Sequence, residues 1–228
     1  MTPTHRIVVR CDDDERPFWT QILSSLNLAF PAEASDERPL WPKILSSLRR
    51  AFKGEASFDL KFVSTLDAAA ARGSDLVCLS MLPDLRHGME GGPGVEAEWR
   101  AAASKLRDHV IARGAPVFIV TIFRHLPREQ RDALPFLRRL NLMALRLSQE
   151  FGLFVIDLDR VLTHRGAIPI GADAWLLGDP ARSVAGDAIV DVLLAAGVDH
   201  LFDDVALKRA LSSQAAQRAG RPAHLSGE

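Results

Sequence analysis

Apolar residues along this chain fall into two alternating patterns, one typical of buried strands and the other typical of amphipathic helices. Five short runs are continuously rich in Val, Ile, Leu and Phe, which indicates strands buried on both faces. We expect these strands at 5–10, 58–64, 75–81, 116–122 and 153–158. Helical spacing occurs between the strands at 67–71, 95–113 and 128–151, and after the last strand at 183–196. Apolar strands that alternate with helices predict an α/β fold, a parallel sheet in a three-layer α/β/α sandwich.

Between the first two expected strands the chain repeats itself. Residues 14–35 and 36–57 match without a gap at 15 of 22 positions, which is a tandem duplication. Each copy carries five apolar residues at helical spacing, so each predicts one helix with an apolar face. The face of the first copy is Trp19, Ile22, Leu23, Leu26 and Phe30, and that of the second is Trp41, Ile44, Leu45, Leu48 and Phe52.

The second copy runs directly into the second expected strand, so we expect it to occupy the helix position of the parent fold. The first copy is then an insertion, and its apolar face needs cover. We expect that cover to be a protein partner or a second copy of this chain. The alternative is that the two helices pair with each other as a hairpin and hide both faces.

Length, charge and hydropathy restrict the classes of protein to which this chain can belong. With 228 residues and 47% apolar residues, we expect one domain over 1–205, with a flexible tail over 206–228. A net charge of −1 lacks the basic surface of a nucleic-acid-binding protein. No run of about 18 apolar residues occurs, so we expect no membrane span, and we expect a cytoplasmic protein.

Metal binding and cofactor chemistry have little support in the residue pattern. Cys11 and Cys78 lie in strand-like segments without metal-ligand spacing, which favours buried, reduced thiols. The acidic residues Asp12, Asp13 and Asp14 follow the first strand and could bind Mg²⁺ through their carboxylates. We favour a helix N-terminal cap instead, because the second copy of the repeat also opens with Asp-Glu. No other cofactor is expected.

In a parallel α/β sheet, ligands bind at the carboxyl ends of the strands. The segments to consider are therefore 11–14, 80–87, 121–125 and 157–164. Ser80 could be a nucleophile, although a serine at a strand end more often makes a structural hydrogen bond. His87 and His125 lie on loops that face this edge, so either could act as a base, and His164 is a similar case.

From about residue 75 to residue 197 the chain resembles the SGNH/GDSL hydrolase superfamily. The matching segments are DLVCLSMLPDL (75–85), GAPVFIVTIFRHLP (114–127), FLRRLNLMALRLSQEFGLFVIDLDRVL (136–162) and DPARSVAGDAIVDVLL (179–194). The resemblance implies a five-stranded parallel sheet of order 2-1-3-4-5. It also implies an ancestral activity on ester bonds.

The catalytic residues of that superfamily do not match this chain. Asp13 stands where the family has its nucleophilic serine, and the segment 80–84 contains neither the glycine nor the asparagine of the oxyanion hole. Asp179 matches the triad aspartate, but Ala181 or Arg182 stands at the histidine position. Ester hydrolysis needs an activated nucleophile and oxyanion donors. The resemblance therefore implies a degenerate site.

A second resemblance covers a shorter span. The segment DLVCLSMLPDLRHGME (75–90) is similar to response-regulator receiver domains, and the acidic residues at 12–14 are similar to their Mg²⁺-binding pair. Ser80 would then replace the phosphoacceptor aspartate, and no lysine stands directly after the fifth strand. The helix expected at 128–151 is also too long for that fold.

The sequence as a whole favours an SGNH/GDSL-hydrolase-like protein with a degenerate ester-hydrolase site. Such a protein would be non-catalytic or weakly catalytic and would act through binding in a cytoplasmic assembly. One alternative is a divergent but active esterase or deacetylase acting on an acylated or carbohydrate ester, with Asp13, Ser80, His87 or His125 rewired into the site. The other alternative is a receiver-like signalling domain.

Overall fold

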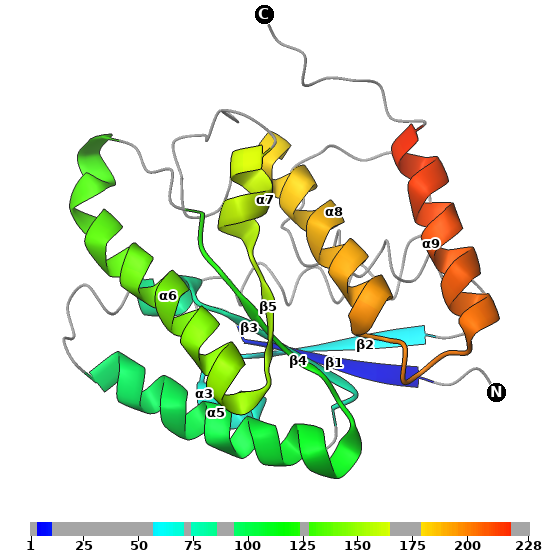
Figure 1. The fold of residues 1–228 in the computed structure, drawn as a ribbon, viewed down its shortest axis with the longest axis horizontal. Coiled ribbons are helices and arrows are strands. Elements are labelled where there is room, and N and C mark those ends of the chain that lie inside the picture. The colour runs from blue at the N-terminus through cyan, green and yellow to red at the C-terminus, as the bar shows by residue number, and fades with distance from the viewer. Residues whose placement is uncertain are drawn as a thin grey trace, which may run out of the picture.

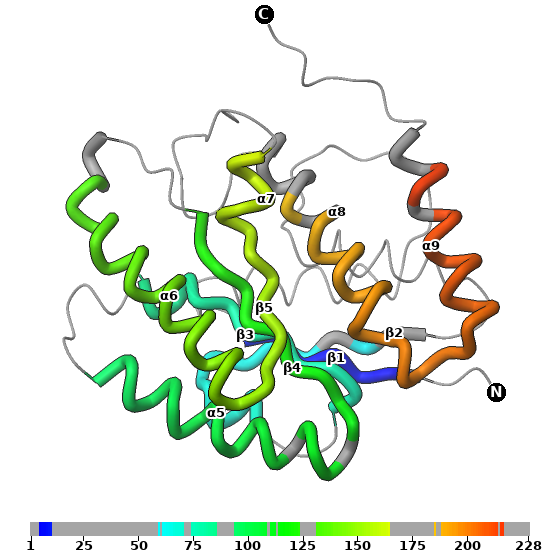
Figure 2. Tube along the Cα trace, in the orientation of Figure 1, coloured from blue at the N-terminus to red at the C-terminus, as the bar shows by residue number. Residues whose placement is uncertain are grey.

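The computed structural model describes residues 4–10, 57–70, 74–85, 94–123, 128–164 and 179–219, which are coloured in Figure 1. Figure 2 follows the same chain as a tube along the Cα trace. The duplicated segment lies outside these ranges, apart from its last residue, Ser57. The expectations for the two repeat helices and for their apolar faces therefore remain predictions.

A five-stranded parallel sheet forms the centre of the molecule (Figure 1). The strands lie in the order β2-β1-β3-β4-β5, which confirms the expected topology. Arg10 pairs with Leu79, Ser80 with Val120, and Val120 with Ile156, so the carboxyl ends of the four strands β1, β3, β4 and β5 lie at one edge. The strands are β1 (Thr4–Arg10), β2 (Ser57–Val63), β3 (Leu76–Ser80), β4 (Val117–Val120) and β5 (Phe154–Ile156).

Helices cover both faces of this sheet, which gives the three-layer α/β/α sandwich expected from the sequence (Figure 1). One face is covered by α3 (Leu66–Ala69), α5 (Gly94–Arg113) and α6 (Leu134–Phe151). The other face is covered by α7 (Leu158–His164), α8 (Asp179–Ala196) and α9 (Asp204–Ala219). A short 3₁₀ helix, η2 (Arg128–Ala133), precedes α6.

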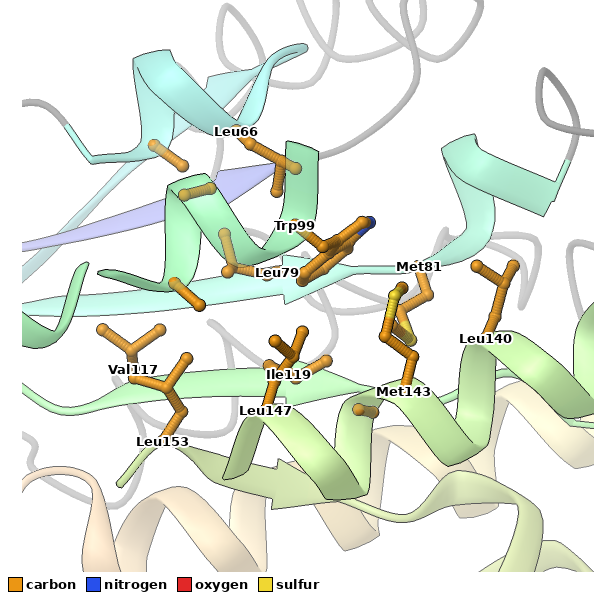
Figure 3. Close-up of a cluster of buried hydrophobic side chains, with 14 of the residues drawn as sticks. Leu66, Leu79, Met81, Trp99, Val117, Ile119, Leu140, Met143, Leu147 and Leu153 are labelled. Carbon is orange, nitrogen blue, oxygen red and sulfur yellow. The ribbon is translucent and has the colours of Figure 1, made fainter. Parts of the chain in front are cut away.

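Each face of the sheet packs against its own hydrophobic cluster, because successive side chains of a strand point to opposite sides. In β1, Ile7 and Val9 belong to the cluster beneath α7, α8 and α9, whereas Val8 belongs to the one beneath α3, α5 and α6. Figure 3 shows this second cluster, in which Trp99 of α5 and Leu147 of α6 pack onto the sheet. The central strands β3 and β4 are buried on both faces, as their continuous apolar sequences predicted.

The segment 128–151 forms η2 followed by α6 rather than the single helix expected from its periodicity. Pro135 explains the break, because proline fits the first turn of an α-helix but not its interior. Gly152 ends α6 in the left-handed conformation with φ of 69°, and its N–H donates to the Ser148 carbonyl at 2.9 Å. This helix end was expected at the same position, since glycine adopts positive φ without a steric penalty.

Helix α9 corrects one expectation about the C-terminal region. A flexible tail was expected over 206–228, but the structure has a helix as far as Ala219. Ala206, Leu207 and Ala210 lie on one side of α9 and pack onto the cluster that includes α8. Small apolar residues were enough to attach this helix, although the segment is rich in Ala, Ser and Arg.

Helix α7 was not among the helices expected from the sequence. Within the residues that the structure describes, no helix is long and apolar enough to cross a lipid bilayer.

Candidate functional site

The carboxyl end of β1 carries a buried arginine. The alternation of β1 places Arg10 on the same face as Val8, beneath α5, and it is only 7% exposed. Its Nη1 and Nη2 atoms donate to the two carboxylate oxygens of Asp84 at 2.6 and 2.9 Å. Nη1 also donates to the Ser80 carbonyl oxygen at 3.0 Å. A buried charge is costly unless it is paired and hydrogen-bonded, and this two-point contact supplies both conditions.

Trp99 completes this group from the side of α5. Its ring centroid lies 5.5 Å from Cζ of Arg10, within the range of a cation–π contact. Trp99 is 1% exposed, and its indole nitrogen has no hydrogen-bond partner in the described structure. The same is true of the Nε atom of Arg10. We refer to Arg10, Asp84 and Trp99 as the arginine cluster.

Ser80, the last residue of β3, is the one candidate nucleophile that the structure describes. Its hydroxyl oxygen accepts from the backbone N–H of Leu82 at 3.2 Å, where residues 82–85 form a helical turn. The N–H of Met81 donates to the Val120 carbonyl at 3.3 Å. Ser80 thus caps a helical turn, as serine side chains often do. Among the described residues, no histidine hydrogen-bonds to Ser80.

A second polar group lies at the ends of β4 and β5. The hydroxyl of Thr121 lies 3.4 Å from a carboxylate oxygen of Asp157, and that same oxygen accepts from the Arg160 N–H at 3.0 Å. Asp157 therefore caps the first turn of α7, a position that aspartate favours. The interactions of this pair hold α7 against the strand ends.

Asn141 ties α6 to the chain after β4. Its side-chain oxygen accepts from the Ile122 N–H at 2.9 Å, and its side-chain nitrogen donates to the Ile122 carbonyl at 2.6 Å. This two-way contact satisfies both backbone groups of a residue that no longer belongs to the strand. The backbone at Ile122, just after β4, is thereby held against α6.

Most of the site residues expected from the sequence lie outside the described residues. These are Asp12, Asp13, Asp14, His87 and His125, and the interaction residues Trp19, Ile22, Leu23, Leu26 and Phe30. Asp179 is the first residue of α8, but its side chain is not described. His164 is exposed at the last residue of α7. Of the catalytic residues predicted from the sequence, Ser80 is the one whose side chain the structure describes, and the contacts expected between it and the others stay predictions.

The sequence reasoning missed the arginine cluster. One signal was present: Arg10 ends a strand whose other residues are buried, and a buried arginine almost always needs a partner. The partner could not be chosen from the sequence, because Asp84 lies 74 positions further along the chain.

Cys78 is the cysteine that the structure describes, and it is a free thiol. Cys78 is completely buried in β3, and burial raises the pKa of its thiol well above its ordinary value. Such a thiol stays protonated and unreactive.

No three His, Cys, Asp or Glu side chains gather to hold a metal ion in the part of the chain that the structure covers.

No protein-family model and no curated protein matches the chain. Several solved structures do match the chain. Its fold is similar to that of an acetylxylan esterase, Axe2, from Geobacillus stearothermophilus, with a TM-score of 0.52, 13% identity, and coverage of 83% of this chain and 94% of the esterase. It is also similar to LAE5, an alpha/beta hydrolase from the metagenome of Lake Arreo, with a TM-score of 0.56, 14% identity, and coverage of 86% and 97%. These likenesses show a fold shared with an esterase and an alpha/beta hydrolase, which is the kind of fold that the resemblance to SGNH/GDSL hydrolases implied.

Proposed function

We propose that this chain is an esterase-like protein whose hydrolytic site is degenerate and which acts through binding. The observation that carries this proposal is the state of the turn after β3. The hydroxyl of Ser80 caps that turn, and its carbonyl oxygen is held by Arg10. The only described candidate nucleophile is thus engaged in structural hydrogen bonds.

The chemistry of ester hydrolysis supports the same conclusion. Acyl transfer needs a nucleophile beside a base, and N–H donors directed at the developing oxyanion. The N–H groups of Met81 and Leu82 are both used within the protein, by Val120 and Ser80. The guanidinium group of Arg10 is bound on two nitrogens by Asp84. We therefore infer that this turn supports binding rather than hydrolysis.

The alternative is a divergent active esterase, and the fold comparison favours it as the second candidate. The similar structures include an acetylxylan esterase, so the substrate would be an acylated carbohydrate. Its catalytic residues would come from Asp13, His87, His125 and Asp179. Receiver domains have the same strand order, 2-1-3-4-5, so the topology does not separate them from hydrolases of this fold. The receiver-like alternative therefore also stays a prediction.

Activity assays separate these candidates. We expect no hydrolysis of p-nitrophenyl acetate above that of a Ser80→Ala control, and no labelling by a serine-directed fluorophosphonate. The reason is that loss of the Ser–His pair removes most of the rate enhancement. Labelling at Ser80 would overturn the proposal. Deacetylation of acetylated xylo-oligosaccharides that is lost in Asp13→Asn would establish the active esterase instead.

The binding role includes a proposed association through the first copy of the repeat, in a cytoplasmic assembly. We expect Leu23→Ala to weaken self-association or partner binding and to affect the stability of the monomer little. Leu45→Ala, in the matching position of the second copy, should instead lower stability by about 2–5 kcal/mol, as buried Leu→Ala changes do. Thermal unfolding and sedimentation of the two variants measure both effects. Equal destabilisation with unchanged association would show that the copies pair with each other.

A further inference from the structure

The two outer strands of the sheet differ in the side chains that they carry. At one edge, β2 holds Asp59 and Lys61, and both are exposed. Charged side chains on an edge strand discourage pairing with another chain. At the other edge, the residues of β5 are Phe154, Val155 and Ile156, which include neither a charge nor a proline. The β5 edge therefore lacks the protection that the β2 edge has.

The backbone of β5 offers hydrogen-bonding groups at this edge. Among the described residues, β4 is the only strand that pairs with β5. The Ile156 carbonyl accepts from the Thr121 N–H at 3.1 Å, so the backbone groups of Ile156 are directed towards β4. Successive residues of a strand direct these groups to opposite sides. The N–H and C=O of Val155 therefore face away from β4, towards the open edge.

Exposed apolar side chains flank β5 on both faces of the sheet, where the strand lies between α6 and α8 (Figure 1). Phe154 stacks on Phe118 with ring centroids 5.1 Å apart, yet it is 43% exposed on the face that α8 covers. On the other face, Leu145 of α6 is 45% exposed. Glu150 of α6 binds Arg100 of α5. Leu145 lies about 140° around the helix from Glu150, so it faces away from α5, towards the β5 end of the sheet.

A second copy of the same edge matches these features. In antiparallel pairing about a twofold axis through Val155, the Val155 N–H of each copy donates to the Val155 carbonyl of the other. The edge is uncharged in both copies, so pairing buries no unpaired charge. Such a contact uses the same surface of both molecules and is closed. The outer strands of the joined sheet are then the two copies of β2, whose charges discourage further pairing.

The size of this surface sets the expected strength of the contact. Three residues of strand span about 10 Å, which is too short to bury the roughly 800 Å² per partner of a standard interface. Phe154 and Leu145 extend the contact to both faces of the sheet, but it stays small. Small interfaces of this kind are weak and transient. We therefore expect association at about micromolar protein concentrations or above.

We propose that two copies of this chain associate through β5, in antiparallel register about Val155, and form one continuous sheet. The hydrogen bonds between the two Val155 residues set the register, and Phe154 and Leu145 of each copy lose exposed apolar surface. The contact does not involve the turn after β3. It is also separate from the association proposed for the first copy of the repeat, so it depends on neither proposal.

The first test follows amide hydrogen exchange of the full chain by NMR, at the Val155 N–H. This N–H faces the open edge in the monomer and is hydrogen-bonded in the dimer, so its exchange should slow as the protein concentration rises. The Ile156 N–H faces β4 in both states and is the internal control. Sedimentation velocity over the same concentrations gives the proportion of dimer.

Lysine substitutions test the side chains beside the strand. Phe154→Lys and Leu145→Lys each place a charge at the edge, and each should weaken dimerisation at least tenfold. Ile111→Lys is the matched control, because Ile111 is 71% exposed on α5, on the side of α6 away from Leu145. It should leave dimerisation unchanged. If Phe154→Lys does not fold, Leu145→Lys decides the test, because Leu145 lies on the surface of its helix.

Two results would overturn the proposal. One is a chain that stays monomeric with a Val155 exchange rate independent of concentration, which would leave this edge to a different occupant. The other is association that survives the lysine substitutions beside β5 but is lost in Leu23→Ala, because the contact would then be made by the repeat.

Discussion

Replacing Asp84 by alanine should lower the free energy of unfolding by about 3–5 kcal/mol. The substitution leaves the Arg10 side chain, which is 8% exposed, without its counter-charge. Two charge-assisted hydrogen bonds, of 2.6 and 2.9 Å, are lost at the same time. Urea unfolding of the variant and of the unmodified chain measures the difference, with unchanged m-values as the check on two-state behaviour.

A double variant separates the loss of a partner from the loss of the pair. Arg10→Met combined with Asp84→Leu removes both charges and keeps apolar volume, so most of the stability should return. If Asp84→Ala lowered the free energy of unfolding by less than about 1 kcal/mol, the effect would be no larger than that of a solvent-exposed ion pair. That result would contradict the buried ion pair.

The second large effect is expected at Leu147 of α6. This residue is 1% exposed and packs onto the sheet in the cluster of Figure 3. Leu147→Ala should cost about 2–5 kcal/mol, through the lost apolar transfer energy and the cavity that remains. Thermal or urea unfolding gives the value.

Leu142 on the same helix is the matched control, because it is 55% exposed. Leu and Ala have similar helix propensities, so Leu142→Ala should change stability by about 0.5 kcal/mol or less. Equal losses at the two positions would mean that α6 does not present the face seen in the structure.

The strands were predictable because their apolar residues are continuous in the sequence. Leu76–Ser80 and Val117–Val120 lie within the expected segments and are buried on both faces. The helix ends at Gly114 and Gly152 were predictable for a local reason, since both residues adopt positive φ. Helix α9 was not, because its attachment depends on Ala206 and Ala210 fitting against α8, which its composition does not reveal.

The candidate site was much less predictable than the fold. Residues at the strand ends could be named from the topology, and Ser80 and Asp157 do lie there. Which of them touch depends on the register between strands that are far apart in sequence. Arg10 meets Asp84 because β1 pairs with β3, and no local pattern encodes that pairing.

The parallel pairing of β1 with β2 bears on how the chain accommodates the duplicated segment. These neighbouring strands are joined by residues 11–56, and one copy of the repeat makes up nearly half of that connection. Loop-closure entropy grows only with the logarithm of length, by about 0.6 kcal/mol for each doubling. An insertion in this connection therefore carries a small entropic cost for the sheet, and the crossover from β1 to β2 can lengthen while the strand register stays the same.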